Sequence, residues 1–492
     1  MAHSHFKSKA KIVCTMGPAL ASTTKIVNAI KAGANAFRLN MSHGSYATHE
    51  EFISHIRAAE EKLEVHVPII VDLQGPKIRV GDFGPGRTSI SLINGREVVL
   101  ADHRIVRARK LEISDHLIPV QYATLAKDVK KGDHLLMDDG LLKLQVVKTD
   151  GDTVTCIVVH GGLLKPRKGI NLPQTTVSTP SITSKDRADV RFAIEHDCDF
   201  IALSFVRTAN DIENIRKYIA KFGGTQPVCA KIEKPEALEN IEEIVKATDL
   251  LMVARGDLGV EIPAEQVPMV QKKLIKMCNK HAKPVITATQ MLESMINNPR
   301  PTRAEASDVA NAVLDGTDGV MLSAETSVGA YPIQAVHYMR QICNQAEAAL
   351  LEDGRLNEGI SNKDYQSPPN TVSIAHAAAR IAEEAHVAAI ASLSYSGETV
   401  RLISSFRPRS VILGITTLRS TARRMSLYWG VTPVILESIT TINETIDRIK
   451  QELIAQKLVS QGSTIVVTTG RPLIGRARTN MLSLETVEST KS

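Results

Sequence analysis

Two short apolar runs in this chain end in a lysine and two acids that together could carry out phosphoryl transfer. The run 228–233 closes with Lys231 and Glu233, and the run 251–257 closes with Asp257. Residues two apart in a strand project to the same face, so Lys231 and Glu233 are predicted to lie side by side. Carboxylates can hold Mg²⁺, and an ammonium group can stabilise negative charge on a phosphoryl group in transit.

Polar side chains also end or follow several other apolar runs, which makes them further candidates for a binding site. They are Arg38, Asn40, Ser42, His43, Asp72, Lys77, Arg79, Arg255 and Thr289. In the segment 255–259, Gly256 would let a ligand approach the backbone, and a helix beginning there would direct N–H groups at an anion. Any single residue of this set could equally be a solvated strand end or a partner in a salt bridge.

These groups can meet only if a scaffold brings the ends of the runs together. Eight apolar runs alternate in most cases with stretches of helical spacing, such as 236–247 and 302–314, the latter with a Thr302/Glu305 capping box. The runs are 10–17, 35–42, 68–75, 200–206, 227–233, 250–257, 284–290 and 319–325. This α/β alternation predicts a closed parallel (β/α)8 TIM barrel with its reactive groups at the C-terminal face.

Two further domains are predicted around the barrel. The long gap after the third run contains short β-rich segments and turns such as Asp138-Asp139-Gly140, which predict an inserted all-β domain able to act as a lid. A polar linker at about 352–370 precedes a second αβ alternation, with a helix from Thr371 and strands at 387–393, 411–415, 433–436 and 464–468. The predicted domains are 1–76 with 177–349 for the barrel, 77–176 for the lid, and 350–492 for a C-terminal α/β regulatory domain.

The composition narrows the class of protein. A net charge of +6 over 492 residues and an aromatic content of 4% argue against nucleic-acid binding and favour anionic metabolites. The six cysteines form no CxxC pair, no apolar run is long enough to span a membrane, and the short polar start leaves no room for a targeting segment, so we expect a cytoplasmic protein. Neither a Gly-Lys dipeptide nor a GxGxxG motif is present, which excludes the common nucleotide-binding loops.

Five segments closely resemble pyruvate kinase, and the resemblance extends from Lys11 to about Asn480. They are Arg38-Leu-Asn-Met-Ser-His-Gly, Ala230-Lys-Ile-Glu, Val253-Ala-Arg-Gly-Asp-Leu-Gly-Val-Glu-Ile-Pro, Ala288-Thr-Gln-Met-Leu-Glu-Ser-Met and Arg300-Pro-Thr-Arg-Ala-Glu. The resemblance implies transfer of a phosphoryl group from phosphoenolpyruvate to ADP, giving pyruvate and ATP in the last step of glycolysis. It also implies a requirement for Mg²⁺ or Mn²⁺ and a homotetramer.

The same resemblance implies a role for each candidate residue. Lys231 and Arg38 would contact the phosphoryl group in transit, and Thr289 would lie beside the enolate face, where water delivers a proton. Glu233 and Asp257 would hold the metal ion, and the backbone at Gly256 and Asp257 would receive the substrate carboxylate. The nucleotide phosphates would be surrounded by Asn40, His43, Arg79 and Lys185.

One departure from the family pattern concerns K⁺. Many members hold K⁺ at positions corresponding to Asn40, Ser42, Asp72 and Leu73, with a nearby glutamate. Here Leu73 has no side-chain oxygen and Lys77 replaces the glutamate, so this segment resembles the branch of the family that works without K⁺. A tethered ammonium group would supply the missing charge, since two like charges about 4 Å apart repel by about 4 kcal/mol at an effective dielectric of 20.

A second candidate site lies in the C-terminal domain. The loop formed by Ser394, Tyr395, Ser396, Gly397, Glu398 and Thr399 could hold a phosphate, although such hydroxyls also serve as ordinary helix caps. The resemblance implies a phosphorylated allosteric effector. Members that bind fructose 1,6-bisphosphate often have lysine at the position of Tyr395, so a sugar monophosphate or nucleoside monophosphate is at least as well supported. Further anion contacts could come from Arg471, Arg476 or Arg478.

Two other functions remain open from the residues alone. Another Mg²⁺-dependent barrel enzyme that forms a pyruvate enolate, such as an aldolase or lyase, could use the same acids, but it would not require the lid or the C-terminal domain. A catalytically inactive binding or scaffold protein, touching RNA through its basic surface, would be expected to lack Lys231, Glu233 or Asp257. All three residues are present.

Overall fold

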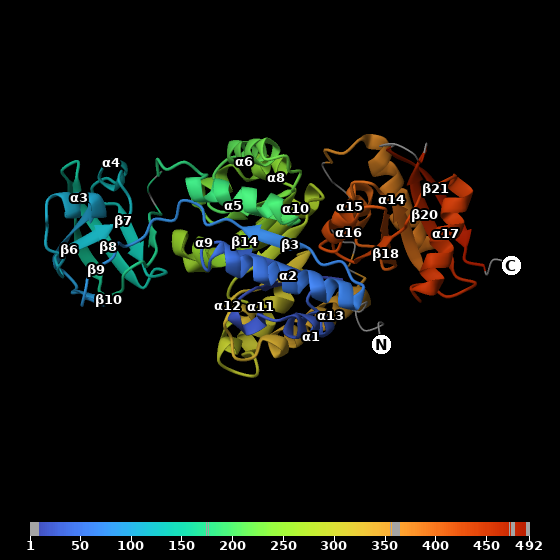
Figure 1. Ribbon diagram of the computed structural model, residues 1–492, viewed down its shortest axis with the longest axis horizontal. Helices are drawn as coiled ribbons and strands as arrows, with labels where there is room; N and C mark the ends of the chain where they lie inside the picture. Colours follow the sequence, from blue (N-terminus) through green and yellow to red (C-terminus); the bar gives the residue numbers. More distant parts are fainter. Residues whose placement is uncertain are drawn as a thin grey trace.

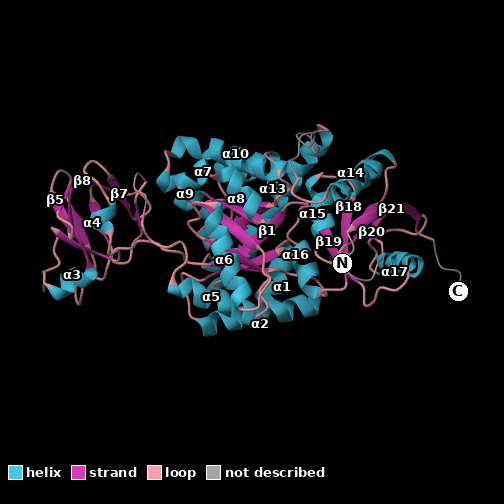
Figure 2. Cartoon of the chain, turned by 90° about the horizontal axis from the view of Figure 1, so that it is seen from above, coloured by secondary structure: helices cyan, strands magenta, loops and turns pink. Residues whose placement is uncertain are grey.

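Three parts of the chain lie in a row, with the barrel between the inserted domain and the C-terminal domain (Figure 1). The computed structural model describes residues 9–173, 175, 177–354, 356, 365–471, 473 and 478–488. The inserted domain is joined to the barrel by two adjacent connections, and the C-terminal domain packs against the opposite side (Figure 2). The residue limits of the three domains stay predictions.

The predicted eight-stranded barrel is confirmed, and each predicted run contains one strand. Its strands form a closed parallel sheet in the order β1-β16-β15-β14-β13-β12-β3-β2. They are β1 (Lys11–Thr15), β2 (Ala36–Asn40), β3 (Ile69–Asp72), β12 (Phe200–Leu203), β13 (Val228–Ile232), β14 (Leu250–Ala254), β15 (Val285–Ala288) and β16 (Gly319–Leu322). The runs are continuously apolar because each strand is buried on both faces.

Alternate strand residues build two cores. In β14, Leu250 and Met252 belong to the cluster inside the barrel, whereas Leu251 and Val253 pack outward against the helices. The inner cluster also includes Leu427 of the C-terminal domain. This domain therefore contributes a side chain to the barrel's own core.

Helices surround the barrel, and short 3₁₀ helices precede or follow some of them. The α-helices are α1 (Thr23–Ala32), α2 (Tyr46–Leu63), α5 (Ser184–Glu195), α6 (Ala209–Lys221), α7 (Pro235–Glu239), α8 (Ile241–Ala247), α9 (Arg255–Glu261), α10 (Val267–Lys280), α11 (Arg303–Leu314), α12 (Ala324–Ser327) and α13 (Pro332–Glu352). The 3₁₀ helices are η2 (Pro18–Leu20), η3 (Ala264–Gln266) and η4 (Glu293–Ile296).

Two local predictions about these helices are confirmed. The Thr302/Glu305 capping box is present at the start of α11. The stretch 236–247 is helical except at Asn240, which separates α7 from α8. The Asn240 amide donates to the carbonyl of Glu236 at 2.9 Å, so its side chain competes with the backbone for helical hydrogen bonds.

The inserted domain is built mainly of sheet, as predicted, but it is not strictly all-β. Its strands form a six-stranded sheet in the order β11-β7-β8-β9-β5-β6 and a two-stranded sheet of β10 and β4. The elements are β4 (Ile90–Leu92), β5 (Glu97–Asp102), α3 (His103–Ala108), β6 (Leu117–Val120), α4 (Leu125–Asp128), β7 (His134–Met137), β8 (Leu142–Thr149), β9 (Thr153–His160), β10 (Gly162–Leu164) and β11 (Ile170–Asn171). The two short helices each connect strands, and alternation within the strands did not reveal them.

The C-terminal domain is an α/β layer with a five-stranded sheet in the order β19-β18-β17-β20-β21. Its elements are α14 (Pro369–Glu384), β17 (Ala389–Leu393), α15 (Glu398–Ser405), β18 (Val411–Thr416), α16 (Arg419–Met425), β19 (Val431–Ile435), α17 (Ile442–Ala455), β20 (Thr464–Gly470) and β21 (Thr479–Thr486). The four predicted strands are present. The fifth strand, β21, was not predicted; it pairs antiparallel with β20 at the sheet edge.

The C-terminal domain binds the barrel where the barrel strands begin. Arg423 pairs with Glu60 at 2.9 Å, Arg407 pairs with Asp318 at 2.9 Å, and Lys11 donates to the carbonyl of Val431 at 2.7 Å. The inserted domain leaves from the end of β3, at the opposite face. Among the residues that the structure describes, no helix combines the length and apolar character needed to cross a membrane.

Candidate active site

Lys231 lies at the centre of a buried cluster of charges at the C-terminal face of the barrel. Its Nζ is 2.8 Å from Oε1 of Glu233 and 3.1 Å from Oδ1 of Asp72. The other oxygen of Asp72 accepts from Nε of Arg38 at 2.6 Å. The predicted proximity of Lys231 and Glu233 is therefore confirmed, and Asp72 connects this pair to Arg38.

Burial and these contacts shift the pKa of Lys231, Asp72 and Glu233. Although burial opposes the charged form, Asp72 and Glu233 raise the pKa of Lys231 well above its usual value. Burial likewise opposes the charge of Asp72, but Lys231 and Arg38 lower its pKa. For Glu233, burial outweighs the attraction of Lys231 and raises the pKa. The cluster thus keeps a permanent ammonium ion in a site from which water is largely excluded.

Helix α9 supplies the second half of the site. It begins directly after β14, so Gly256 and Asp257 occupy its first turn, where backbone N–H groups have no partner within the helix. The N–H of Gly256 donates to Oγ1 of Thr289 at 2.7 Å. Asp257 accepts from Nζ of Lys77 at 2.8 Å, and Lys77 lowers the pKa of Asp257 despite its burial.

Thr289 is held in a strained backbone conformation beside α9. Its φ of 66° lies in the left-handed region, which is unusual for a β-branched residue. The guanidinium of Arg255 donates to the carbonyl of Thr289 at 2.7 Å and is itself anchored by Asp308 at 2.7 Å. These contacts hold the Thr289 hydroxyl at the mouth of the barrel.

The residues predicted to contact the nucleotide lie around the loop that follows β2. Lys185 of α5 donates to the carbonyl of Met41 at 2.8 Å and to Asp189 at 2.7 Å. Burial, together with the positive charges of Arg79, Arg38 and Lys77, lowers the pKa of His43, so this ring is neutral at pH 7.

The remaining members of this group have local partners. The side chain of Asn40 accepts from the N–H of Ser42 at 3.1 Å. Arg79 reaches from the connection to the lid and donates to the carbonyl of Arg167 at 3.1 Å. The region is therefore rich in cations, as the phosphates of a nucleotide would require.

The residues at the positions assigned to a monovalent cation differ in where their side chains lie and in what those side chains contact. Asn40 and Asp72 are register partners on adjacent strands, so their side chains lie close together. The side chain of Leu73 is only 1% exposed and packs into the core outside the barrel, while its carbonyl accepts from Ser204 at 2.7 Å. The ammonium of Lys77 points to Asp257.

Two residues of this site were not among the sequence candidates. Ser204 accepts from Lys231 at 2.8 Å, and the N–H of Phe205 donates to Oε2 of Glu233 at 2.7 Å. Both lie at the end of the fourth predicted run. The fourth run comes directly before the fifth, which carries Lys231 and Glu233. Neighbouring parallel strands end at the same edge of a sheet, so this position could have indicated Ser204 and Phe205.

The carboxylates present fit a Mg²⁺ or Mn²⁺ ion bound partly by substrate. Asp257 is one of the charges that act on Glu233, so the two acids share one region. Within the described ranges, no group of three or more His, Cys, Asp or Glu side chains is arranged to hold a metal ion. Mg²⁺ is commonly bound by one or two protein carboxylates, with water and phosphate oxygens as its other ligands. Glu233 and Asp257 would supply the two carboxylates, and the substrate and water would supply the rest.

The predicted effector loop caps helix α15. The hydroxyl of Ser394 accepts from the N–H of Gly397 at 3.0 Å, and that of Ser396 accepts from Glu398 at 3.4 Å. Gly397 has a φ of 82°, which favours glycine there. The ring of Tyr395 is exposed.

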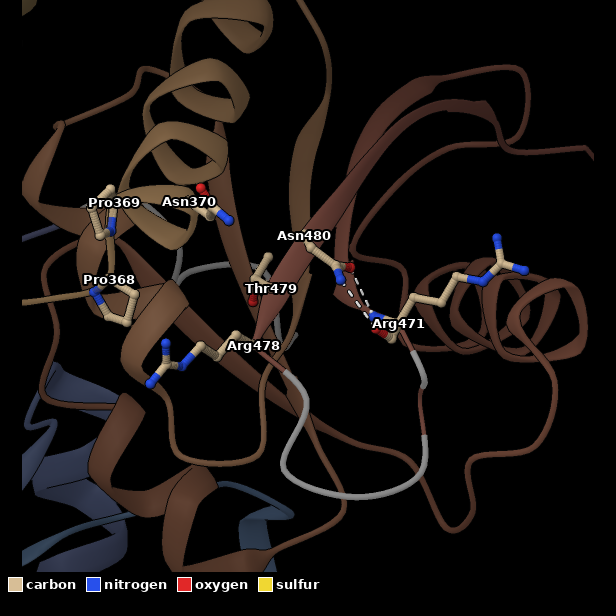
Figure 3. A pocket seen from close by; sticks show the side chains of 7 residues that line it. All are labelled: Pro368, Pro369, Asn370, Arg471, Arg478, Thr479 and Asn480. Atoms are coloured by element: carbon tan, nitrogen blue, oxygen red, sulfur yellow. Dashed lines mark hydrogen bonds between the residues drawn. The ribbon is translucent and has the colours of Figure 1, made fainter.

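The C-terminal domain also contains a pocket of about 390 Å³ (Figure 3). Its lining residues are Pro368, Pro369, Asn370, Arg471, Arg478, Thr479 and Asn480. The pocket and loop meet where the buried hydroxyls of Thr399 and Thr479 lie 2.6 Å apart. Figure 3 shows the side chain of Arg471 directed away from that of Arg478. Arg476 lies outside the described residues.

Comparison with known proteins gives one consistent result over nearly the whole chain. The family descriptions "Pyruvate kinase, barrel domain" and "Pyruvate kinase, alpha/beta domain" match residues 7–336 and 372–484. The chain is 43% identical to the pyruvate kinase of Geobacillus stearothermophilus, over 98% of this chain and 81% of the relative. It is 44% identical to that of Staphylococcus aureus strain MRSA252, over 97% and 80%.

A solved structure gives the same answer for the fold. The crystal structure of a pyruvate kinase from Cryptosporidium parvum is similar, with a TM-score of 0.91 and 34% identity. The similarity covers 99% of this chain and 98% of that one.

Proposed function

The chain belongs to the pyruvate kinase family of phosphotransferases, and we propose that its barrel face transfers a phosphoryl group from phosphoenolpyruvate to ADP, giving pyruvate and ATP. The observation that carries this proposal is the position of Lys231, whose ammonium is fixed between Asp72 and Glu233 and stays charged. A phosphoryl group in transit carries spread negative charge and needs positioned cations more than a covalent nucleophile.

The other residues have supporting roles in this proposal. Arg38 orients the phosphoryl group from the opposite side of Asp72, while Glu233 and Asp257 hold Mg²⁺ or Mn²⁺. When bound, the metal ion neutralises charge on the substrate oxygens. The N–H groups of Gly256 and Asp257 receive the substrate carboxylate, which replaces the Thr289 hydroxyl on Gly256.

Proton delivery and nucleotide binding complete the reaction. Thr289 orients the water that protonates the enolate of pyruvate. Asn40, His43, Arg79 and Lys185 surround the phosphates of ADP, and the neutral ring of His43 donates or accepts hydrogen bonds without adding charge.

The proposal extends to three properties of the whole protein. Lys77 supplies a positive charge near the site, so the enzyme works without K⁺. A phosphorylated effector binds at the Ser394–Thr399 loop and the adjoining pocket, and the protein acts as a cytoplasmic homotetramer. The six buried free thiols fit a reducing compartment.

A direct assay tests the reaction. Purified protein with Mg²⁺, phosphoenolpyruvate and ADP should form ATP and pyruvate in equal amounts, and the Lys231→Met variant purified in parallel controls for contaminating kinase. Release of pyruvate and inorganic phosphate without ATP would indicate that the protein hydrolyses phosphoenolpyruvate as a phosphatase instead. Absence of both products from the folded protein would contradict the proposed reaction.

A further inference from the structure

Helix α9 lies on the side of the barrel that faces the inserted domain (Figures 1 and 2). Contacts from that side reach it at both ends. Lys77, on the outgoing connection, binds Asp257 in the first turn at 2.8 Å. Asn171, on the returning strand β11, binds Glu261 at the last residue of the helix. Between these two contacts, Gly140 of the inserted domain also approaches the helix: a Cβ atom added to this glycine would lie 3.6 Å from the side chain of Val260.

The contact at Glu261 is a buried junction of three separate parts of the fold. Its Oε1 accepts from Nδ2 of Asn171 at 2.8 Å and from Nζ of Lys234, just after β13, at 2.5 Å. All three residues are buried. Oε2 of Glu261 has no hydrogen-bond partner among the described residues. The carboxylate is therefore positioned through one oxygen, and one of its two donors belongs to the inserted domain.

The two connections that carry Lys77 and Asn171 form a single unit. The N–H of Ile170 donates to the carbonyl of Ile78 at 2.9 Å, and Arg79 forms a β-bridge with Gly169. Because the connections are paired, a rotation of the inserted domain must move Lys77 and Asn171 together. A helix of seven residues is only about 10 Å long, so a shift at its last residue displaces its first turn as well.

We propose that Asn171 is a positioning residue for the substrate and metal site. It holds Glu261, and through α9 it sets the place of the Gly256 N–H and the Asp257 carboxylate. The inference rests on the proposed function of that site and deepens it: the orientation of the lid determines how well the barrel binds metal and substrate, even before the lid covers them.

The test compares Asn171→Ala with Asn94→Ala. Asn94 accepts from the N–H of Gly161 at 2.6 Å inside the same domain, so this control removes one lid hydrogen bond without touching α9. In the ligand-free protein, Asn171→Ala should speed amide hydrogen exchange in residues 255–261, and Asn94→Ala should not. For Asn171→Ala, the Kd for Mn²⁺ and the KM for phosphoenolpyruvate should rise about tenfold, and the KM for ADP should change less.

Each outcome decides the proposal. Equal exchange and equal Mn²⁺ affinity in the two variants would overturn it, and so would faster exchange spread over the whole inserted domain. If Asn171→Ala does not fold, Asn171→Leu fills the space without a donor and is judged by the same measurements. If the wild-type protein makes no ATP, the proposed reaction fails, while the exchange comparison still decides whether Asn171 holds α9.

Discussion

The ammonium nitrogen of Lys231 lies 2.8 Å from a carboxylate oxygen of Glu233, two residues further along the chain. The same nitrogen is 3.1 Å from Asp72, which is two strands away in the barrel. Each carboxylate stabilises the charge on Lys231, and removing any one member leaves a buried charge with less compensation. The predictions for the barrel site follow from this arrangement.

Replacing Lys231 with Met should lower kcat by on the order of 10² or more, with little change in KM for phosphoenolpyruvate, because the ammonium acts mainly on the phosphoryl group in transit. Steady-state kinetics measure both constants. A thermal melt must accompany them, since Asp72 then loses one of the two cations with which it pairs among the described residues. An unchanged kcat would remove Lys231 from the mechanism.

Replacing Glu233 with Gln or Asp257 with Asn should raise the Mg²⁺ concentration needed for half-maximal activity by about tenfold or more, because each change removes a ligand charge. Direct titration with Mn²⁺ provides a second readout that does not depend on turnover. Asp308→Asn is a suitable control, since Asp308 anchors Arg255 near the site without belonging to the proposed metal ligands. Wild-type metal dependence in either variant would refute that ligand assignment.

The unmodified protein should reach nearly full activity without K⁺, and the double variant Leu73→Thr, Lys77→Glu should acquire dependence on K⁺. The double change replaces the tethered ammonium that now pairs with Asp257 by a carboxylate, whereas the new hydroxyl at position 73 would start in the core outside the barrel, where Leu73 packs. Ionic strength must be held constant with a bulky cation, so that screening is not mistaken for site binding. Strong, saturable activation of the wild type by K⁺ would contradict this expectation.

Replacing Ser396 or Arg478 with Ala should raise the concentration of a phosphorylated effector needed for half-activation by about tenfold, the effect of losing about 1.4 kcal/mol of charge-assisted hydrogen bonding. Activity without effector should stay the same, because both residues lie in the C-terminal domain. A screen of sugar and nucleoside monophosphates identifies the ligand. Thr399→Ser is the control, since it keeps the buried hydroxyl beside Thr479. Activation that survives both alanine variants would place the effector elsewhere.

The joint between the barrel and the C-terminal domain should make stability depend on pH through Lys11. Burial, and then the charge of Arg340, lowers the pKa of Lys11 to about 7, although Glu347 opposes the shift. Between about pH 7 and the usual value of 10.5, the unfolded chain binds a proton that the folded chain does not. Stability contributed by this group therefore rises with pH across that window, by up to about 1.4 kcal/mol per pH unit.

The Lys11→Met variant measures this contribution. Its melting temperature should rise less between pH 7 and pH 9 than that of the wild type, because the variant has no titrating group at this position. The comparison uses melting temperatures because a chain of three domains need not unfold in one step. Parallel pH profiles for the two proteins would show that Lys11 keeps its proton when buried.

The barrel could be predicted from the sequence because each of its strands is buried on both faces. Such strands are continuous apolar runs, and their polar ends mark the catalytic edge. The pairing of Lys231 with Glu233 follows from strand geometry alone. Strand β21 escaped prediction because polar residues such as Ser483 and Glu485 interrupt its apolar run at the edge of the sheet.

Contacts between distant segments depended on the tertiary structure. Closure of the barrel brings Asp72 to Lys231 across β12, and the paired connections of the inserted domain bring Lys77 and Asn171 to the two ends of α9. Residue identity already shows which side chains can ionise, and local periodicity indicates where each strand ends. Only the folded chain decided which charges meet, because a buried charge is stable only beside a partner that the topology delivers.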